Sequence, residues 1–224
     1  MKFTTRKIPG SEALQILIEQ RQRFPKTGHY PFLIGEADEI ARINDASNLY
    51  QEEPAAIIQK SLAINMADWM ANRQSELQDD GMDAEEILGE WPRKKVGHGS
   101  IRLHTDVLTG EVMSEIYMGF AKIKEPWHWA AAIKWGGWND CPLPEIHCAI
   151  HRDWQNRFGA EVTGVSSVVV ECIVRKPPQD RAGAIALAWE QYWYCPDIVE
   201  QGCVSISNLA ASLLDSPYWF FWWD

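Results

Sequence analysis

The chain has 224 residues, 46% of them hydrophobic, which is enough to bury a real core in one large domain or two small ones. Its formal net charge is −10, and both halves are acidic: 15 basic and 19 acidic residues precede Glu125, and 6 and 12 follow Lys124. Nucleic-acid binders need basic residues to displace counterions, so we expect no nucleic-acid partner. An acidic surface favours solubility and encounter with basic partners.

Cysteine usage and the absence of long apolar runs predict a cytoplasmic protein. The five cysteines are odd in number and match no disulfide framework. The segment Met1–Arg6 lacks the apolar stretch of a secretory signal, and no apolar run approaches the roughly 18 residues that span a bilayer. We therefore expect free thiols in a reducing compartment and no membrane partner.

The first part of the chain alternates apolar patterns with Gly and Pro breaks. It predicts a strand over Lys2–Ile8, a helix from Ala13 that has Ser11 as N-cap and ends at Pro25 to Gly28, and a buried strand over Tyr30–Gly35. We then expect a short helix over Glu36–Asn44, one helix from Pro54 to Leu77 and a short helix from Asp83 to Leu88. An exposed loop over Trp91–Ser100 follows, and Ile101–His104 and Val112–Met118 form a hairpin or a pair of adjacent strands.

A change in composition predicts a boundary near Lys124. Ten of the 12 tryptophans lie from Trp127 onward. We expect an N-terminal α+β region over residues 1–124 and a Trp-rich domain over residues 125–224, or one continuous globule of both.

The second part predicts helices and antiparallel strands. We expect a strand or short helix over Trp129–Trp135, a helix over Pro144–Phe158 that ends at Gly159, strands over Ala160–Val165 and Val168–Val174, a helix from Asp180 to Tyr194, a helix over Leu209–Leu214 capped by Ser205 or Ser207, and a strand after Pro217. The fold class is then α+β, with a mainly antiparallel sheet flanked by helices. The aromatic run Trp219–Trp223 lies inside that sheet and is covered on both faces, or on one face with the other in an interface.

An ordered set of short motifs carries a family resemblance. The motifs are Trp135-Gly136-Gly137-Trp138-Asn139-x-Cys141-Pro142, Trp154-x-x-Arg157-Phe158-Gly159-Ala160-Glu161, Arg175-x-Pro177-Pro178, Tyr194-Cys195-Pro196-Asp197 with Gln201-Gly202, and Trp219-Phe220-Phe221-Trp222-Trp223-Asp224. Together they resemble the DUF4253 family over roughly the last hundred residues. Such proteins are mainly bacterial, and the resemblance implies a domain without supplying catalytic residues.

Several residues could serve an enzyme. His147 and His151 stand four apart on a predicted helix, the spacing of a helical metal pair, but the Glu that serves as base in zinc proteases is missing between them. A hydrolase or transferase, metal-dependent or not, could place a cleft around Asp140, Cys141, His147, His151, Cys195 and Asp197. Core histidines and a buried cysteine at a kink explain the same pattern, so we expect neither a metal nor a cofactor.

The interpretation that the sequence favours is a non-catalytic protein-binding module, with the enzyme as the alternative. Candidate binding residues are exposed aromatic and acidic side chains, namely Trp127, Trp129, Trp138, Asp140, Asp197 and Asp224. Arg157, Arg175 or Arg181 could clamp the carboxylates of Asp224, but a solvated or salt-bridged end without a binding role explains the same residues. By analogy with small acidic bacterial proteins, the module is expected to be an immunity or antitoxin protein that binds a basic toxin enzyme.

Overall fold

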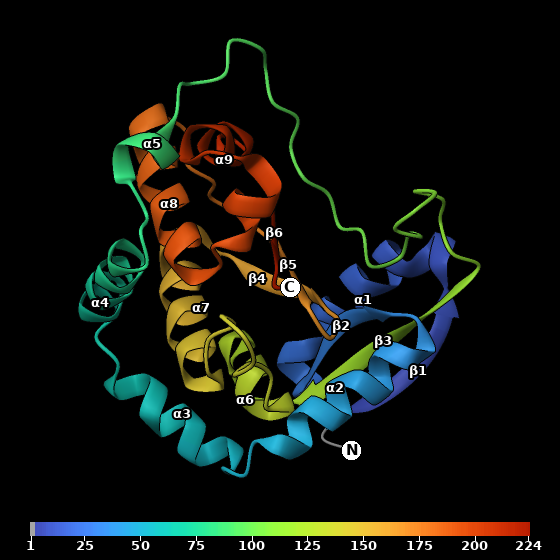
Figure 1. Ribbon diagram of the computed structural model, residues 1–224. Helices are drawn as coiled ribbons and strands as arrows, with labels where there is room; N and C mark the ends of the chain where they lie inside the picture. Colours follow the sequence, from blue (N-terminus) through green and yellow to red (C-terminus); the bar gives the residue numbers. More distant parts are fainter. Residues whose placement is uncertain (1–2) are drawn as a thin grey trace.

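A six-stranded sheet runs through the middle of the protein in a computed structural model, which describes residues 3–224 (Figure 1). Its strands are β1 (Thr4–Pro9), β2 (His29–Gly35), β3 (Glu115–Lys122), β4 (Glu161–Val165), β5 (Val169–Ile173) and β6 (Tyr218–Trp222). They lie in the order β1-β3-β2-β4-β5-β6. Only the β2–β4 pair is parallel among these described strands. The sheet and its flanking helices confirm the predicted α+β class.

Helices make up most of the remaining regular structure. They are α1 (Ala13–Thr27), α2 (Ala37–Leu49), α3 (Pro54–Ala63), α4 (Met66–Asp79), α5 (Ala84–Leu88), α6 (Trp129–Ile133), α7 (Pro144–Phe158), α8 (Arg181–Tyr194) and α9 (Ile206–Leu213), with short 3-10 turns η1 (Gly10–Glu12) and η2 (Pro126–His128) and a π-helical turn η3 (Ile198–Cys203). No helix among residues 3–224 has the length and apolar character needed to cross a bilayer.

The two faces of the sheet are covered differently. On one face, Ala13 and Leu17 of α1 pack with Leu33, Ile116 and Met118 of the central strands. On the other face lie α6 to α9, which Figure 1 shows gathered to one side of the strands. This second layer contains most of the large aromatic side chains, so it forms the larger core.

Strands from both sides of Lys124 share this sheet. The first three strands precede that residue, the last three follow it, and the β2–β4 contact joins the two sets through Leu33 and Gly164. Lys2, with which the first predicted strand begins, lies outside the described residues.

Strand β6 lies at the edge of the sheet, antiparallel to β5. Trp219, Phe221 and Trp223 point into the larger core, with at most 2% of their surface exposed. Phe220, on the opposite face, is 42% exposed. The prediction that β6 belongs to the sheet is confirmed, and its second apolar face remains partly open.

Two predicted helices differ from the observed ones. The single helix from Pro54 to Leu77 is wrong, because α3 ends at Ala63 and α4 begins at Met66. Between them, the Asn65 side chain accepts a hydrogen bond from the backbone N–H of Ala67 at 3.0 Å. An asparagine that caps a new helix competes with continuation of the old one. Helix α2 also continues past its predicted end at Asn44 to Leu49, whereas α1 contains Pro25 and ends at Thr27, with Gly28 (φ 67°) as its C-cap, within the predicted end.

The predicted strand over Ile101–His104 is also wrong. This segment is irregular, and the strand that follows begins only at Glu115. A single bridge between Thr105 and Val112 closes the intervening turn, which we call the 105–112 turn. The backbone N–H groups of Arg102 and Leu103 donate to the Glu171 side chain, and only the His104 backbone oxygen accepts from the opposite arm, from the Met113 N–H at 3.0 Å.

Helix ends in the second half follow the predicted signals. Helix α7 spans Pro144–Phe158 and ends at Gly159 in the left-handed conformation. Asp180 caps α8, Ser205 caps α9, and the segment after Trp129 takes the helical alternative. Local signals predict these ends well because each cap is a contact within one turn.

Candidate binding site

Four of the six side chains expected around an enzymatic cleft are buried beside the larger core, whereas Asp140 is exposed and Asp197 is partly exposed. His147, His151 and Cys195 are at most 2% exposed, and Cys141 is 4% exposed. The Tyr194 hydroxyl lies 2.6 Å from Nδ1 of His147 and 3.1 Å from Nε2 of His151. Aromatic rings, including those of Trp129, Trp135 and Trp223, surround the imidazoles. A substrate in solution does not reach these groups in this structure.

Burial keeps this cluster uncharged. Desolvation lowers the pKa of His147 well below its usual value and that of His151 to about 3. Burial likewise raises the pKa of Cys141 and Cys195 above the usual thiol value. A reactive cysteine needs a lowered pKa, so both thiols have the electrostatics of buried structural cysteines. Within residues 3–224 there is no group of three or more His, Cys, Asp or Glu side chains placed to hold a metal ion.

The six candidate binding residues fall into two groups. Trp129 is buried at 1% exposure, whereas Trp127 and Trp138 are partly exposed. Trp138 packs edge-on against Trp135, and the guanidinium of Arg152 lies over Trp127. The first group is therefore largely core.

The acidic candidates lie near the end of β6. The Asp197 carboxylate accepts the backbone N–H of Asp224 at 2.9 Å, and the Asn139 side chain donates to the Asp224 backbone oxygen at 2.7 Å. Asp140 pairs with Arg73 at 3.1 Å. The predicted arginine clamp on Asp224 is wrong, because Arg157, Arg175 and Arg181 contact Glu190, Glu161 and Trp91, respectively.

A pocket of about 640 Å³ opens on the other face of the sheet. It lies between the 105–112 turn, the end of β2, and the outer strands β5 and β6. The walls are mainly apolar, and the apolar residues that line them include Ile34, Leu103, Met113, Val169, Phe220 and Trp222. A volume of this size and a mainly apolar lining are typical of binding sites for small ligands and peptide segments.

One carboxylate, that of Glu171, lies in the wall of this pocket. Glu171 is in the middle of β5 and is 1% exposed. Its Oε1 accepts the backbone N–H of Arg102 at 2.6 Å, and its Oε2 accepts that of Leu103 at 3.4 Å. Desolvation raises the pKa of Glu171 to about 7, against the opposing effect of the two backbone hydrogen bonds. A carboxyl group with a strongly shifted pKa in a cleft marks a candidate functional site.

Glycine in the neighbouring strand makes room for this carboxylate. Gly164 of β4 is the cross-strand partner of Glu171. A Cβ atom at position 164 would lie 2.7 Å from Oε2 of Glu171 and 2.7 Å from a methyl carbon of Leu103. A side chain at this position would therefore push the carboxylate or the 101–104 segment out of place.

The rim of the pocket carries exposed apolar side chains. Val107 and Leu108, at the tip of the 105–112 turn, are 97% and 95% exposed. The tip is held by the Asp106 carboxylate, which accepts the backbone N–H groups of Leu108 at 2.9 Å and Thr109 at 2.7 Å. The turn therefore presents two apolar side chains to solvent from a hydrogen-bonded backbone.

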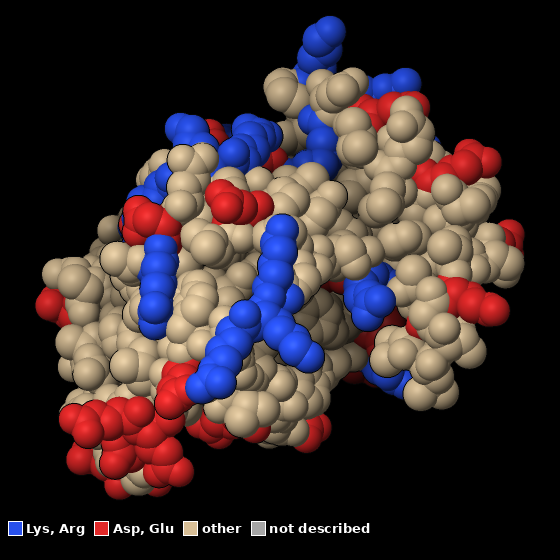
Figure 2. Space-filling view, turned by 90° about the horizontal axis from the view of Figure 1, so that it is seen from above, with Lys and Arg blue, Asp and Glu red and all other residues tan. Residues whose placement is uncertain are grey.

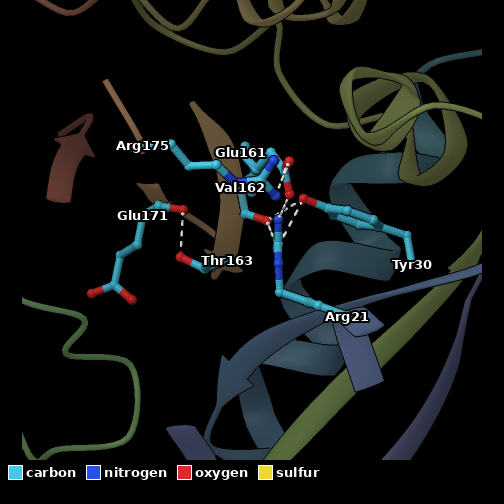
Figure 3. A network of polar contacts seen from close by, with 7 residues as sticks. All are labelled: Arg21, Tyr30, Glu161, Val162, Thr163, Glu171 and Arg175. Carbon is cyan, nitrogen blue, oxygen red and sulfur yellow. Dashed lines mark hydrogen bonds and ion pairs between the residues drawn. The ribbon is translucent and has the colours of Figure 1, made fainter. Parts of the chain in front are cut away.

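A second glutamate, Glu161, whose side chain is 12% exposed, shows how this fold satisfies a carboxylate with cations. Arg21 of α1 and Arg175 both form ion pairs with Glu161 (Figure 3). Arg21 also donates to the backbone oxygen of Val162 at 2.8 Å and to the Tyr30 hydroxyl at 3.0 Å. Figure 3 shows the Glu171 side chain extending away from this network. The network joins α1 to β4, whereas the Glu171 carboxylate stands apart from it.

Comparison with known families assigns the C-terminal part of the chain. Residues 117–224 match the family described as "Domain of unknown function (DUF4253)". This part of the chain is therefore similar to the DUF4253 family. No curated protein and no solved structure matches the chain significantly. The match confirms the resemblance carried by the tryptophan, arginine and glycine motifs.

The pocket combines the DUF4253 domain with the preceding part of the chain. The domain supplies β5 and β6, including Glu171 and Phe220, while Leu103 and the 105–112 turn come from residues before Tyr117. Sequence reasoning missed Glu171. The available signal was a single carboxylate within the otherwise apolar run Val168–Val174. The turn residues Val107 and Leu108 were also missed, because burial cannot be read from a short apolar pair.

Proposed function

We propose that the protein is a non-catalytic binding module that docks a protein partner over the pocket and its apolar rim. The observation that carries the proposal is the exposure of Val107 and Leu108 on a hydrogen-bonded turn. Phe220, Val112 and Val168, at 42%, 52% and 37% exposure, extend the apolar surface near the pocket. Apolar surface of this kind around a concave site is typical of interfaces.

The charge of the protein favours a basic partner. The chain carries a formal charge of −10, and complementary charge accelerates encounter and disfavours acidic competitors. Figure 2 shows, however, that one face also carries many Lys and Arg side chains, with acidic ones spread among them and densest at one corner. The net charge therefore steers a partner from a distance, and the apolar rim determines where it docks.

An immunity protein is the more specific form of this proposal. A toxin enzyme that acts on nucleic acid carries a basic surface, which an acidic protein can mask. The test is co-expression of the protein with the product of each neighbouring gene that is toxic when expressed alone. Restored growth supports the immunity role, and continued toxicity in every pair contradicts it.

The binding function itself is tested by charge on the rim. A tagged Val107→Asp/Leu108→Asp variant should lose a partner that the unaltered protein retains at a fixed stoichiometry from its own cells. The matched control is Leu49→Asp, because Leu49 is also exposed, at 84%, but lies at the end of α2. Both positions are exposed, so both variants should change the free energy of unfolding by no more than about 0.5 kcal/mol.

The outcome is read by quantitative mass spectrometry of the recovered proteins. Loss of the same partner from the rim variant and from the Leu49→Asp control would place the docking surface elsewhere. A partner that both variants retain would contradict the proposed surface while leaving the protein a binding module.

A further inference from the structure

The Glu171 carboxylate is buried without a cation in contact with it, although the charge of Arg102 acts on it through space and lowers its pKa. Among residues 3–224, no Lys, Arg or His side chain forms an ion pair or a hydrogen bond with it, and its side-chain contacts are the two backbone N–H groups. Arg102 contributes its backbone N–H, and its own side chain is exposed. Buried charges in proteins are normally paired, as Glu161 is by Arg21 and Arg175. Glu171 differs from Glu161 because no cationic side chain contacts its carboxylate.

The unpaired carboxylate still has capacity to accept hydrogen bonds. An ionised carboxylate offers roughly four acceptor positions. Here Oε1 takes one short contact and Oε2 one long contact of 3.4 Å, which is weak. Glu171 lines the pocket, so the remaining positions are available to a group that enters it.

The pocket walls suit an apolar stem. Phe220 is the cross-strand neighbour of Glu171, and Trp222 pairs with Val169 on the same strands. Leu103 and Met113 line the pocket from the preceding segment. Lysine and arginine carry a charged end on a long aliphatic stem, which covers apolar surface while the charge finds a partner.

Charge at the pocket also favours a cation. The carboxylates in its lining are Glu36, Glu39, Asp106 and Glu171, and the guanidinium is that of Arg102. Glu39 is partly neutralised by Arg42, and Asp106 is occupied with its turn. Glu171 is therefore the buried group with a charge left to balance.

We propose that the pocket takes a lysine or arginine side chain of the protein partner, with its charged end on the Glu171 carboxylate and its stem between β6 and the 101–104 segment. The inference rests on the proposed binding function. A protein segment is favoured over a small free amine because the exposed rim residues Val107 and Leu108 gain burial only from a partner that extends beyond the pocket.

Glu171 also has a structural role, since it holds the backbone of residues 102 and 103 against the sheet. The test must therefore separate recognition from stability. We use two pools of acetylated, amidated pentapeptides with Leu, Val, Phe or Tyr at the flanking positions. The central residue is lysine in one pool and norleucine in the other. Norleucine has the same aliphatic stem as lysine but lacks the ammonium group.

The pools are passed over the immobilised full-length protein at pH 7.5 and low salt, and retained peptides are quantified by mass spectrometry. The lysine pool should be retained at least about tenfold better than the norleucine pool, as expected for a charge-assisted hydrogen bond. Glu171→Gln should bring this ratio close to one. Glu85→Gln, which removes the same charge from an exposed position in α5, should leave the ratio unchanged.

Equal retention of the two pools by the unaltered protein, or no retention of either, overturns the inference. So does a lysine preference that persists in Glu171→Gln, because the general acidic field then explains it. Complete displacement of the lysine pool by an equal concentration of hexylamine assigns the pocket to small organic cations and overturns the peptide occupant. If the unaltered protein retains the norleucine pool as well as the lysine pool and the Val107→Asp/Leu108→Asp variant retains neither, the docking surface is supported. The proposal that the pocket takes a basic side chain is then rejected.

A second measurement covers the case in which Glu171→Gln folds poorly. The side-chain carboxyl carbon of Glu171 in the unaltered protein is followed by ¹³C NMR at pH 7. Addition of the lysine pool should move this signal toward that of the ionised form, and the norleucine pool should not. No movement with the lysine pool contradicts the inference.

Discussion

The two faces of strands β5 and β6 treat buried polar groups in opposite ways. Toward the larger core, His147 and His151 are uncharged and share the Tyr194 hydroxyl inside a shell of aromatic rings. Toward the pocket, Glu171 keeps only backbone partners and borders an open cavity. A closed polar cluster of the first kind specifies packing, whereas an unbalanced carboxylate beside a cavity is a site for recognition.

The largest expected difference in stability is between side chains on the two faces of the segment that contains β6 and the next residue, Trp223. Trp223 is fully buried and contacts the rings of Trp135, His147 and Tyr194. Trp223→Ala should lower the free energy of unfolding by about 3–5 kcal/mol, since it removes a large buried ring and leaves a cavity. The measurement is urea denaturation followed by circular dichroism.

The matched variant on the other face is Phe220→Ala. Phe220 is 42% exposed, so the expected loss is much smaller, about 1 kcal/mol. Similar losses for the two variants would mean that the pocket face is as closed in solution as the core face, which contradicts the distinction between them.

The sequence predicts the sheet with its flanking helices, and the helix caps in the second half, better than it predicts the candidate site. Alternation along the aromatic segment was hidden because all five residues from Trp219 to Trp223 are apolar. The pattern therefore could not say that Trp219, Phe221 and Trp223 are buried while Phe220 is exposed. The pairing with β5, which is separated from β6 by two helices, determines that difference.

The candidate site was missed for a related reason. Glu171 is one carboxylate in an apolar strand, and its partners, the backbone N–H groups of Arg102 and Leu103, lie 69 and 68 residues away in the chain. His147 and His151 were predicted to share a helix face, and they do, because helical spacing is local. Whether that face meets solvent or core depends on α8 and β6, which only the fold brings together.

The next prediction concerns how pH separates the two faces. Burial raises the pKa of Glu171 from the usual 4.5 to about 7 in the folded protein, so the folded state binds the proton more tightly than the unfolded state does. Glu171 therefore contributes most to the free energy of unfolding below pH 4.5. This contribution, about 3 kcal/mol in total, is lost as the pH rises to 7. Glu171→Gln removes this titration.

The difference in unfolding free energy between the unaltered protein and Glu171→Gln should therefore shift by about 3 kcal/mol between pH 4.5 and 7, in favour of Glu171→Gln at the higher pH. Comparison at each pH cancels the opposing effect of the histidines, whose lowered pKa values make the protein less stable below about pH 6.5. A constant difference across this range would mean that the carboxylate is solvated, and the pocket would then lack its buried charge.

An effect smaller than that of Trp223→Ala is expected in the histidine cluster. Tyr194→Phe removes the hydroxyl that contacts Nδ1 of His147 and Nε2 of His151, and leaves both ring nitrogens buried without that partner. The loss should be about 1–3 kcal/mol at pH 7.5, the cost of unsatisfied buried polar atoms. Because Tyr194 lies on the core face, the ratio of lysine to norleucine peptide retention should not change. A Tyr194→Phe variant that folds as before and yet loses the lysine preference would show that the two faces are coupled through the sheet, and that the closed cluster takes part in recognition.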